Sequence, residues 1–127
     1  MPKIQHLETS GENSLIKFLK ELYDKHPGED RLYVKPLVDI IKEFEEKGPQ
    51  INKIHKNFIP FKKLEGNKYK DIYELRTKKC RYFIYKDEPN IYVGLHGFEK
   101  KSDDTPQNEL TKARKEVELW KRTKNKK

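Results

Sequence analysis

Residues 69–101, YKDIYELRTKKCRYFIYKDEPNIYVGLHGFEKK, decide the fold of this chain. They contain three runs rich in β-branched and aromatic side chains, at residues 69–76, 81–86 and 90–96. The segments between these runs are short. Short connections join antiparallel neighbours, because a parallel return needs a crossover of a dozen or more residues. The stretch therefore predicts a three-stranded antiparallel meander.

Two amphipathic helices are expected before the meander, over residues 12–25 and 31–47. In each, the apolar side chains recur at spacings of three and four, which gives a single apolar stripe. Since neither stripe can remain in water, we expect an N-terminal helical hairpin that packs on the sheet. Residues 3–7 have the pattern of a short edge strand, and we interpret residues 50–68 as a loop or short helix.

A third helix is expected over residues 105–123, at the C-terminal end. Thr105 and Pro106 suit its start, because proline is favoured at the first helical position. Its apolar residues step by three, four and three, which predicts one buried face: Leu110, Ala113, Val117 and Trp120.

The predicted fold class is α+β, with a helical hairpin on a small antiparallel sheet and a C-terminal helix. A length of 127 residues favours a single domain, 1–127. Within it, residues 1–68 form the helical scaffold and connector, residues 69–101 the meander, and residues 105–123 the last helix.

The composition is basic and rich in charge. Lys and Arg number 29 against 21 Asp and Glu, which gives a net charge of +8, and 11% of residues are aromatic. This balance points to nucleic acid or another polyanion, and a solvated lysine-rich surface is the alternative. Only 33% of residues are hydrophobic, but their clear periodicity favours a folded chain.

Several classes of site and of protein are disfavoured by the sequence. Cys80 is the single cysteine, so no disulfide forms within the chain, and the four histidines do not have zinc-ligand spacing. A structural role for Cys80 is favoured over a nucleophilic one, because no histidine lies near it in sequence. No signal peptide and no apolar run of about 18 residues is present, so we expect a soluble, cytoplasmic protein.

The candidate chemistry lies where the strands end in cations. Arg76, Arg81, Lys100 and Lys101 stand at these ends, with His96 in the last strand. Arginine grips phosphate bidentately, and fixed positive charge stabilises a transition state with extra negative charge. In RNA the 2′-OH is a nucleophile already in place, so positioning and charge matter most. Aromatic side chains on the open sheet face are a candidate platform for unpaired bases.

Four marks in the sequence resemble one known family. They are ELR at residues 74–76, Arg81 with aromatic alternation after it, LHGFEKK at residues 95–101, and Thr105-Pro106 before a helix with Ala113. Together they resemble the HigB branch of the RelE-like toxins of bacterial type II toxin–antitoxin systems, including phage-derived members. The resemblance covers roughly half of the chain, from about residue 64 to residue 120.

The resemblance implies a RelE-like α+β toxin that cleaves mRNA on the ribosome by 2′-OH attack, with no cofactor and no metal. It implies that Arg76 and Arg81 grip phosphate, that Lys100 or Lys101 stabilises the transition state or protonates the leaving oxygen, and that His96 is an acid or base. The partner implied is a helix-turn-helix antitoxin. Further RNA contacts are expected from Lys62, Lys63, Lys78, Lys79 and Tyr85.

One departure from the family and several alternatives stay open. Better-studied RelE members carry lysines on the first core strand where this chain has Ile72 and Glu74, which leaves the general base unassigned. Glu74 could instead pair with a neighbouring arginine, and His96 is equally consistent with a satisfied buried histidine. Two rival functions remain: a ParE-like toxin that inhibits a topoisomerase, and an RNA-binding module without enzyme activity.

Overall fold

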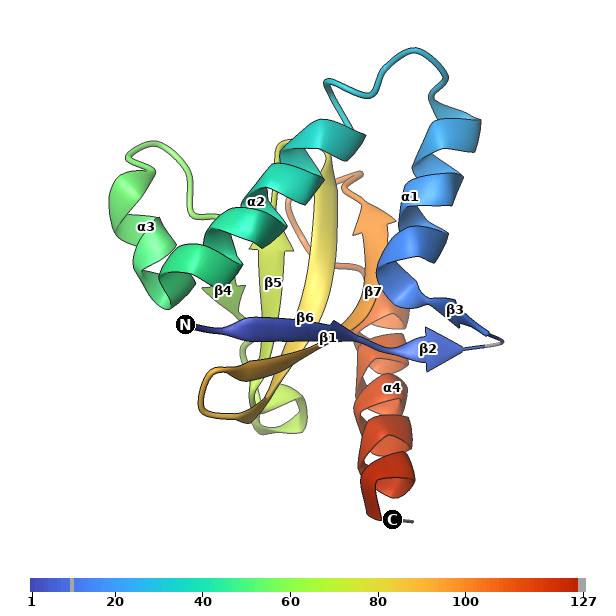
Figure 1. Ribbon diagram of the computed structural model, residues 1–127, viewed down its shortest axis with the longest axis vertical. Coiled ribbons are helices and arrows are strands. Elements are labelled where there is room, and N and C mark those ends of the chain that lie inside the picture. The colour runs from blue at the N-terminus through green and yellow to red at the C-terminus, as the bar shows by residue number, and fades with distance from the viewer. Residues whose placement is uncertain (10, 126–127) are drawn as a thin grey trace.

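The chain begins with a strand and ends with a long helix (Figure 1). The computed structural model describes residues 1–9 and 11–125. In chain order the elements are β1 (Lys3–His6), β2 (Glu8–Thr9), β3 (Glu12–Asn13), α1 (Ser14–Lys25), α2 (Val34–Lys47), the 3-10 turn η1 (Gly48–Gln50), α3 (Ile51–Ile54), β4 (Phe61–Lys63), the 3-10 turn η2 (Asn67–Tyr69), β5 (Ile72–Arg76), β6 (Cys80–Glu88), β7 (Ile91–Glu99) and α4 (Gln107–Asn125).

The central sheet has five strands in the order β1-β7-β6-β5-β4. Strands β5, β6 and β7 are antiparallel neighbours, which confirms the predicted meander. β5 starts only at Ile72, because Asp71 has a positive φ of 64° and residues before it form η2. The edge strand expected at residues 3–7 is present as β1, and it pairs in parallel with β7. Strand β4 lies within residues 50–68, where the sequence pattern does not indicate a strand.

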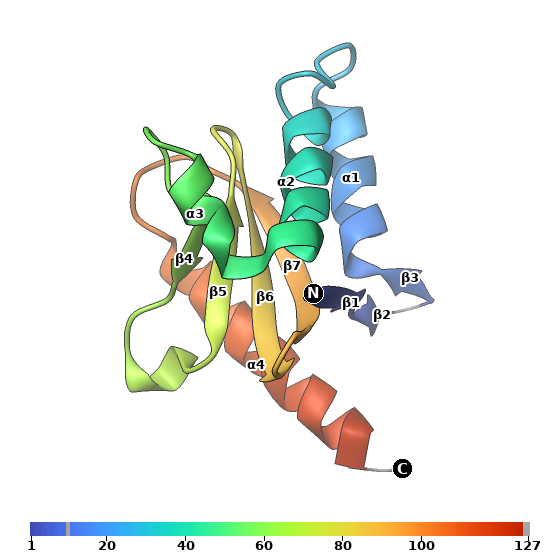
Figure 2. The same cartoon turned by 60° about the vertical axis from the view of Figure 1, so that its left-hand side comes forward.

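The expected N-terminal helical hairpin is not confirmed. The amino terminus forms β1, and the short β2–β3 pair precedes α1. Helix α1 begins at Ser14, where the side chain of Asn13 accepts a hydrogen bond from the Ile16 N–H (2.8 Å). α1 then packs on β7, whereas α2 packs on β5, so each helix covers its own part of the sheet (Figure 2).

Each face of the sheet carries its own apolar core. The face toward α1 and α2 buries Leu37, Phe44 and Tyr82, each 0% exposed. The opposite face is covered by α4, whose Ala113 and Val117 pack on the side chains of β5, β6 and β7. The buried face expected for the C-terminal helix is therefore confirmed. The expectation of an open stacking platform is wrong, because α4 occupies that face.

A chain of buried hydrogen bonds ties β1 and α1 to the sheet. The Tyr82 hydroxyl lies 2.7 Å from His6 Nδ1 and 2.8 Å from Ser14 Oγ, and the Ser14 hydroxyl donates to the Gly94 carbonyl oxygen (3.0 Å). All donors are satisfied if His6 Nδ1–H donates to Tyr82, whose hydroxyl donates to Ser14. Gly94 makes room for this chain, because a Cβ there would lie 2.4 Å from the Tyr82 hydroxyl oxygen.

His6 is expected to make the stability of the fold depend on pH. Burial lowers the pKa of His6 from its ordinary value of 6.5, against an opposing effect of Glu45. A lowered pKa in the folded state means that the unfolded chain binds the proton more readily. The stabilising contribution is thus present above pH 6.5 and is lost as the pH falls through the folded-state pKa.

The measurement is urea unfolding of the wild type and of His6→Gln between pH 7.5 and 5. We expect the free energy of unfolding to fall less steeply toward acid in the variant, because the glutamine amide cannot take up a proton. Equal slopes in the two proteins would contradict the prediction. Comparing slopes, rather than absolute stabilities, removes the cost of the substitution itself.

Candidate functional site

The ends of three strands meet at one edge of the sheet and bring cations together. Arg76, the last residue of β5, lies directly opposite Arg81, near the start of β6. The Lys100 N–H, just after β7, donates to the Lys79 carbonyl oxygen (2.8 Å). We call Arg76, Arg81 and Lys100 the strand-end cluster. The sheet register therefore assembles the three cations that the sequence placed at strand ends.

A buried glutamate stands beside this cluster. Glu74 is 3% exposed, and its Oε1 accepts a hydrogen bond from the Thr105 hydroxyl (2.6 Å). Its Oε2 lies 4.0 Å from Arg76 Nε. That distance is too long for a hydrogen bond, so the pair is an ion pair with room between the charges.

The Arg76 guanidinium has unused hydrogen-bonding capacity. Its carbon Cζ lies 5.8 Å from the ring centre of Phe58, and its Nε is buried with no hydrogen-bond partner among the described residues. A buried donor without an acceptor costs about 1–3 kcal/mol. An anion bound here would therefore gain a charged donor that the fold leaves unsatisfied.

A cavity of about 250 Å³ opens at this edge, and we call it the strand-end cavity. Its floor includes Glu74 and Arg76, and the exposed side chains of Lys62 and Lys63 line it from β4. The remaining lining comes from the connection between β4 and β5, from the segment before α4 and from the first turn of α4: Leu64, Glu65, Tyr69, Asp103, Asp104, Thr105 and Leu110.

Arg81 is held more tightly than the sequence suggested. It is 4% exposed, and its Nη1 donates to the carbonyl oxygens of Thr77 and Cys80. Burial and, to a lesser degree, the nearby Arg76 charge lower the pKa of Arg81, whereas Glu74 opposes this shift. Arg81 Nη1 thus stabilises the β5–β6 turn, and the guanidinium contributes positive charge to the strand-end cluster from a buried position.

The structure separates the two lysines that follow β7. Lys100 Nζ lies 3.3 Å from Asp103 Oδ1, on the side of the strand-end cavity. Lys101 is exposed and lines a different cavity, against α1. Neighbouring residues of an extended chain point to opposite sides, which explains the split. Lys100, rather than Lys101, is therefore the cation that accompanies Arg76 and Arg81.

His96 lies in a buried cluster of side-chain contacts between β7 and α4. Its side chain is 7% exposed, its Nδ1 contacts Glu116 Oε1, and its Nε2 lies 3.2 Å from Glu109 Oε1. Both ring nitrogens are thus occupied by carboxylates of α4. The arrangement matches the satisfied buried histidine that the sequence left open, and a catalytic role for His96 stays a prediction.

The residues expected to contact RNA lie in different settings. Lys62, Lys63, Lys78 and Lys79 are exposed near the strand-end cluster. Tyr85 is 8% exposed, with Lys121 Nζ 5.6 Å from its ring centre, and α4 covers its face of the sheet. Its ring is therefore not available for base stacking in this structure.

Cys80 and metal chemistry receive no support from the geometry. Cys80 is 0% exposed, and burial is the main cause that raises the pKa of its thiol to about 12. A buried thiol of this kind is a structural residue rather than a nucleophile. Within residues 1–9 and 11–125, no group of three or more His, Cys, Asp and Glu side chains is placed to hold a metal ion.

The sequence profile of the phage-derived Gp49-like proteins (DUF891) matches residues 30–118. The chain belongs to this family. The Gp49-like family is associated with RelE/HigB-like toxins of toxin–antitoxin systems, which indicates a toxin-like protein of phage origin. No curated protein shows significant similarity to the chain. No helix in the described part of the Gp49-like chain has the length and apolar character of a membrane span.

Two residues of the site are not assigned by the sequence alone. The sequence offers Glu74 only as a partner for an arginine, and Thr105 only as a helix start. The strand alternation that puts Glu74 and Arg76 on the same face is the available signal. The hydrogen bond between Glu74 and Thr105 joins segments that are distant in sequence, and no local pattern predicts it.

Proposed function

We propose that this Gp49-like protein is the toxin of a type II toxin–antitoxin system and cleaves mRNA during translation. The observation that carries the proposal is the strand-end cavity. Glu74 and Arg76 line it, Arg81 lies opposite Arg76 on the neighbouring strand, and Arg76 Nε lacks a partner among the described residues. Family membership supports a toxin, and this donor set suits a phosphodiester better than a neutral ligand.

The proposed reaction uses the 2′-OH of the RNA as its nucleophile. Glu74 takes the 2′ proton, the 2′ oxygen forms a bond to phosphorus, and the bond from phosphorus to the 5′ oxygen breaks. The products are a 2′,3′-cyclic phosphate and a 5′-OH end, and Lys100 delivers the proton to the leaving 5′ oxygen. Arg76 and Arg81 stabilise the additional negative charge of the transition state.

The proposed activity involves two partners, a substrate and an antitoxin. The substrate is mRNA on the ribosome, and a helix-turn-helix antitoxin neutralises the toxin. The net charge of +8 favours association with ribosomal RNA at low salt. Neither a cofactor nor a metal enters the proposed steps, because the 2′-OH, Glu74 and the cations supply the chemistry.

The test is expression in a bacterial host with mapping of mRNA ends. We expect the wild type to arrest growth within minutes and to create new mRNA ends with 5′-OH groups inside coding regions. Arg76→Ala should abolish both effects, whereas Arg31→Ala, which removes an exposed arginine of the α1–α2 connection, should retain them. Thermal unfolding of the purified proteins shows whether Arg76→Ala is folded.

Two outcomes would overturn the proposal. If Arg76→Ala is folded and still produces the same new ends, the strand-end cavity does not hold the scissile phosphate. If the wild type arrests growth while mRNA stays intact, the protein acts by binding, as a topoisomerase-inhibiting toxin does.

A further inference from the structure

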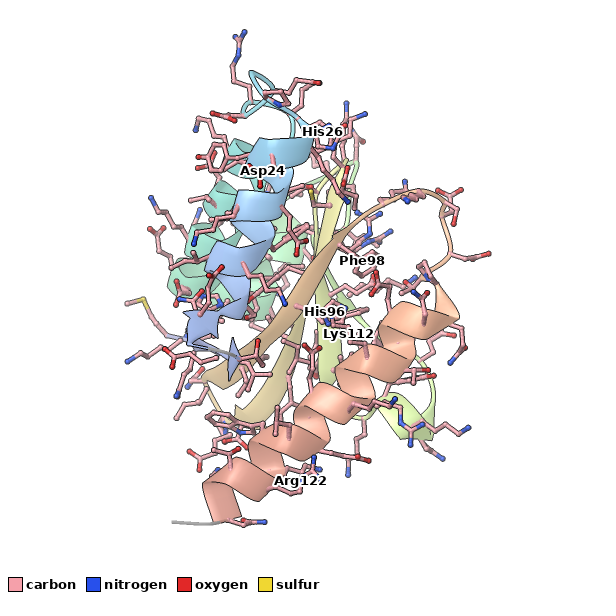
Figure 3. All side chains as sticks on the ribbon, turned by 90° about the vertical axis from the view of Figure 1, so that its right-hand side faces the viewer. Asp24, His26, His96, Phe98, Lys112 and Arg122 are labelled. Atoms are coloured by element: carbon pink, nitrogen blue, oxygen red, sulfur yellow. The ribbon has the colours of Figure 1, made fainter. Side chains whose placement is uncertain are left out.

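A groove runs between α1 and α4 across the end of β7. Two hollows of about 390 Å³ and 260 Å³ share the lining residues Phe18, Glu21, Gly97 and Lys112, so they form one continuous groove. His96, Phe98 and Lys112 lie along it in Figure 3. We call it the α1–α4 groove. It is distinct from the strand-end cavity, because neither Arg76 nor Glu74 lines it.

Four lysines and four glutamates line this groove, and they differ in how they are paired. Lys17, Lys101 and Lys112 are exposed on its walls, and none of the three forms an ion pair with a residue of the described chain. Three of the four glutamates have a partner, since Glu99 contacts Lys25 and His26, and Glu109 and Glu116 both contact the single ring of His96. Among the lining acids, Glu21 alone contacts neither a lysine nor a histidine within residues 1–9 and 11–125.

The groove begins next to the proposed site of cleavage. Lys100 pairs with Asp103, which lines the strand-end cavity, whereas Lys101 lines the groove, and neighbouring Cα atoms are about 3.8 Å apart. The cations therefore continue from Arg76 and Lys100 through Lys101 to Lys112 and Lys17. A linear polyanion that occupies the cavity at one phosphate would reach the groove with the next ones.

We propose that the α1–α4 groove binds the backbone of single-stranded RNA flanking the scissile phosphate. This inference rests on the proposed function, and it assigns Lys17 and Lys112 as RNA-binding residues. The apolar lining residues Phe18, Leu22 and Phe98 are all under 10% exposed. A protein partner would find no open apolar pocket for anchor residues, whereas spaced lysines suit a chain with one charge per nucleotide.

The test compares two matched pairs of neutralised lysines. Lys17→Gln/Lys112→Gln removes two charges from the groove, and Lys42→Gln/Lys47→Gln removes two exposed charges from α2, away from the groove. Binding is measured by fluorescence anisotropy across a potassium chloride series. The probe is a short mixed-sequence RNA with 2′-O-methyl groups at every position, which cannot be cleaved by 2′-OH attack.

We expect the groove variant to bind more weakly and with a smaller salt dependence. For a single strand, each phosphate contact with a cation contributes about 0.7 to the magnitude of the slope of log K against log salt. Loss of the two groove lysines should therefore reduce that magnitude by about 1.4. The α2 pair should leave the slope at the wild-type value. Cleavage products of unmodified RNA should keep the same ends in both variants, because neither pair belongs to the strand-end cluster.

Each contrary result has a separate meaning. An unchanged slope in the groove variant overturns the inference, while Arg76-dependent cleavage would leave the proposed function standing. Equal losses of RNA affinity in the two variants also overturn it, because they indicate that binding depends on the net charge of the protein rather than on the groove. If the groove pair weakens binding of poly-glutamate but not of RNA, the groove docks an acidic protein segment instead. Absence of cleavage by the wild type would refute the proposed function itself.

Discussion

Glu74→Gln is expected to lower the rate of RNA cleavage by about two to four orders of magnitude, the usual contribution of a general base. Glutamine keeps the size of the side chain and an oxygen that accepts the Thr105 hydroxyl, but it cannot remove the 2′ proton. The Thr105 bond (2.6 Å) and the nearby Arg76 hold the carboxylate at the floor of the strand-end cavity. The measurement is the single-turnover cleavage rate on programmed ribosomes, with toxin in excess.

The matched control is Glu46→Gln, which makes the same charge change on the exposed face of α2. We expect its cleavage rate to equal that of the wild type. Binding of the 2′-O-methyl RNA should be retained in Glu74→Gln, because the loss of a negative charge does not weaken a polyanion site. A folded Glu74→Gln protein that cleaves at the wild-type rate would show that another group takes the proton.

Local sequence patterns predicted most elements of the fold, but they did not predict the pairing of strands that are distant in sequence. The meander follows from short turns, and the apolar stripe of α4 follows from its periodicity. Strand β4 has three residues, which is too short for a pattern. The parallel pairing of β1 with β7 joins segments from opposite halves of the chain. The hairpin expectation did not include the strands β1, β2 and β3 that precede α1, nor the packing of α1 and α2 on different strands, β7 and β5.

The candidate site shows the same division. The opposition of Arg76 and Arg81 follows from the short turn between their strands, and the sequence therefore located the cluster. The burial of Arg81 depends on carbonyl groups of the turn that only the folded backbone aims at its guanidinium. The environment of His96 comes from two glutamates of α4, and the availability of Tyr85 is decided by the same helix. Local sequence patterns do not tell which residues a distant element such as α4 will cover.

Gly97→Ala is expected to destabilise the protein by about 3 kcal/mol or more, at the upper end of the cost of overpacking. Gly97 sits within LHGFEKK, and its environment explains why this position lacks a side chain. A Cβ at residue 97 would lie 2.1 Å from Cδ2 of Phe18, a residue of α1 that is 4% exposed and packed in the core. The backbone φ of Gly97 is not positive, so the cost is steric rather than conformational. Urea unfolding measures it directly.

A double-mutant cycle separates this clash from a general loss of stability. Phe18→Leu shortens the side chain that the added methyl group would meet, so the cost of Gly97→Ala should fall by more than about 1 kcal/mol in that background, the coupling expected of touching residues.

Gly28→Ala is the control. Gly28 has a φ of +79° and no atom within 4 Å of an added Cβ, so its cost arises from backbone strain and should add to that of Phe18→Leu. If Gly97→Ala costs the same free energy of unfolding in the Phe18→Leu background as in the wild type, the clash with Phe18 is not the cause of the destabilisation. Coupling would instead show that the close approach of α1 to β7, which forms one wall of the α1–α4 groove, depends on this glycine.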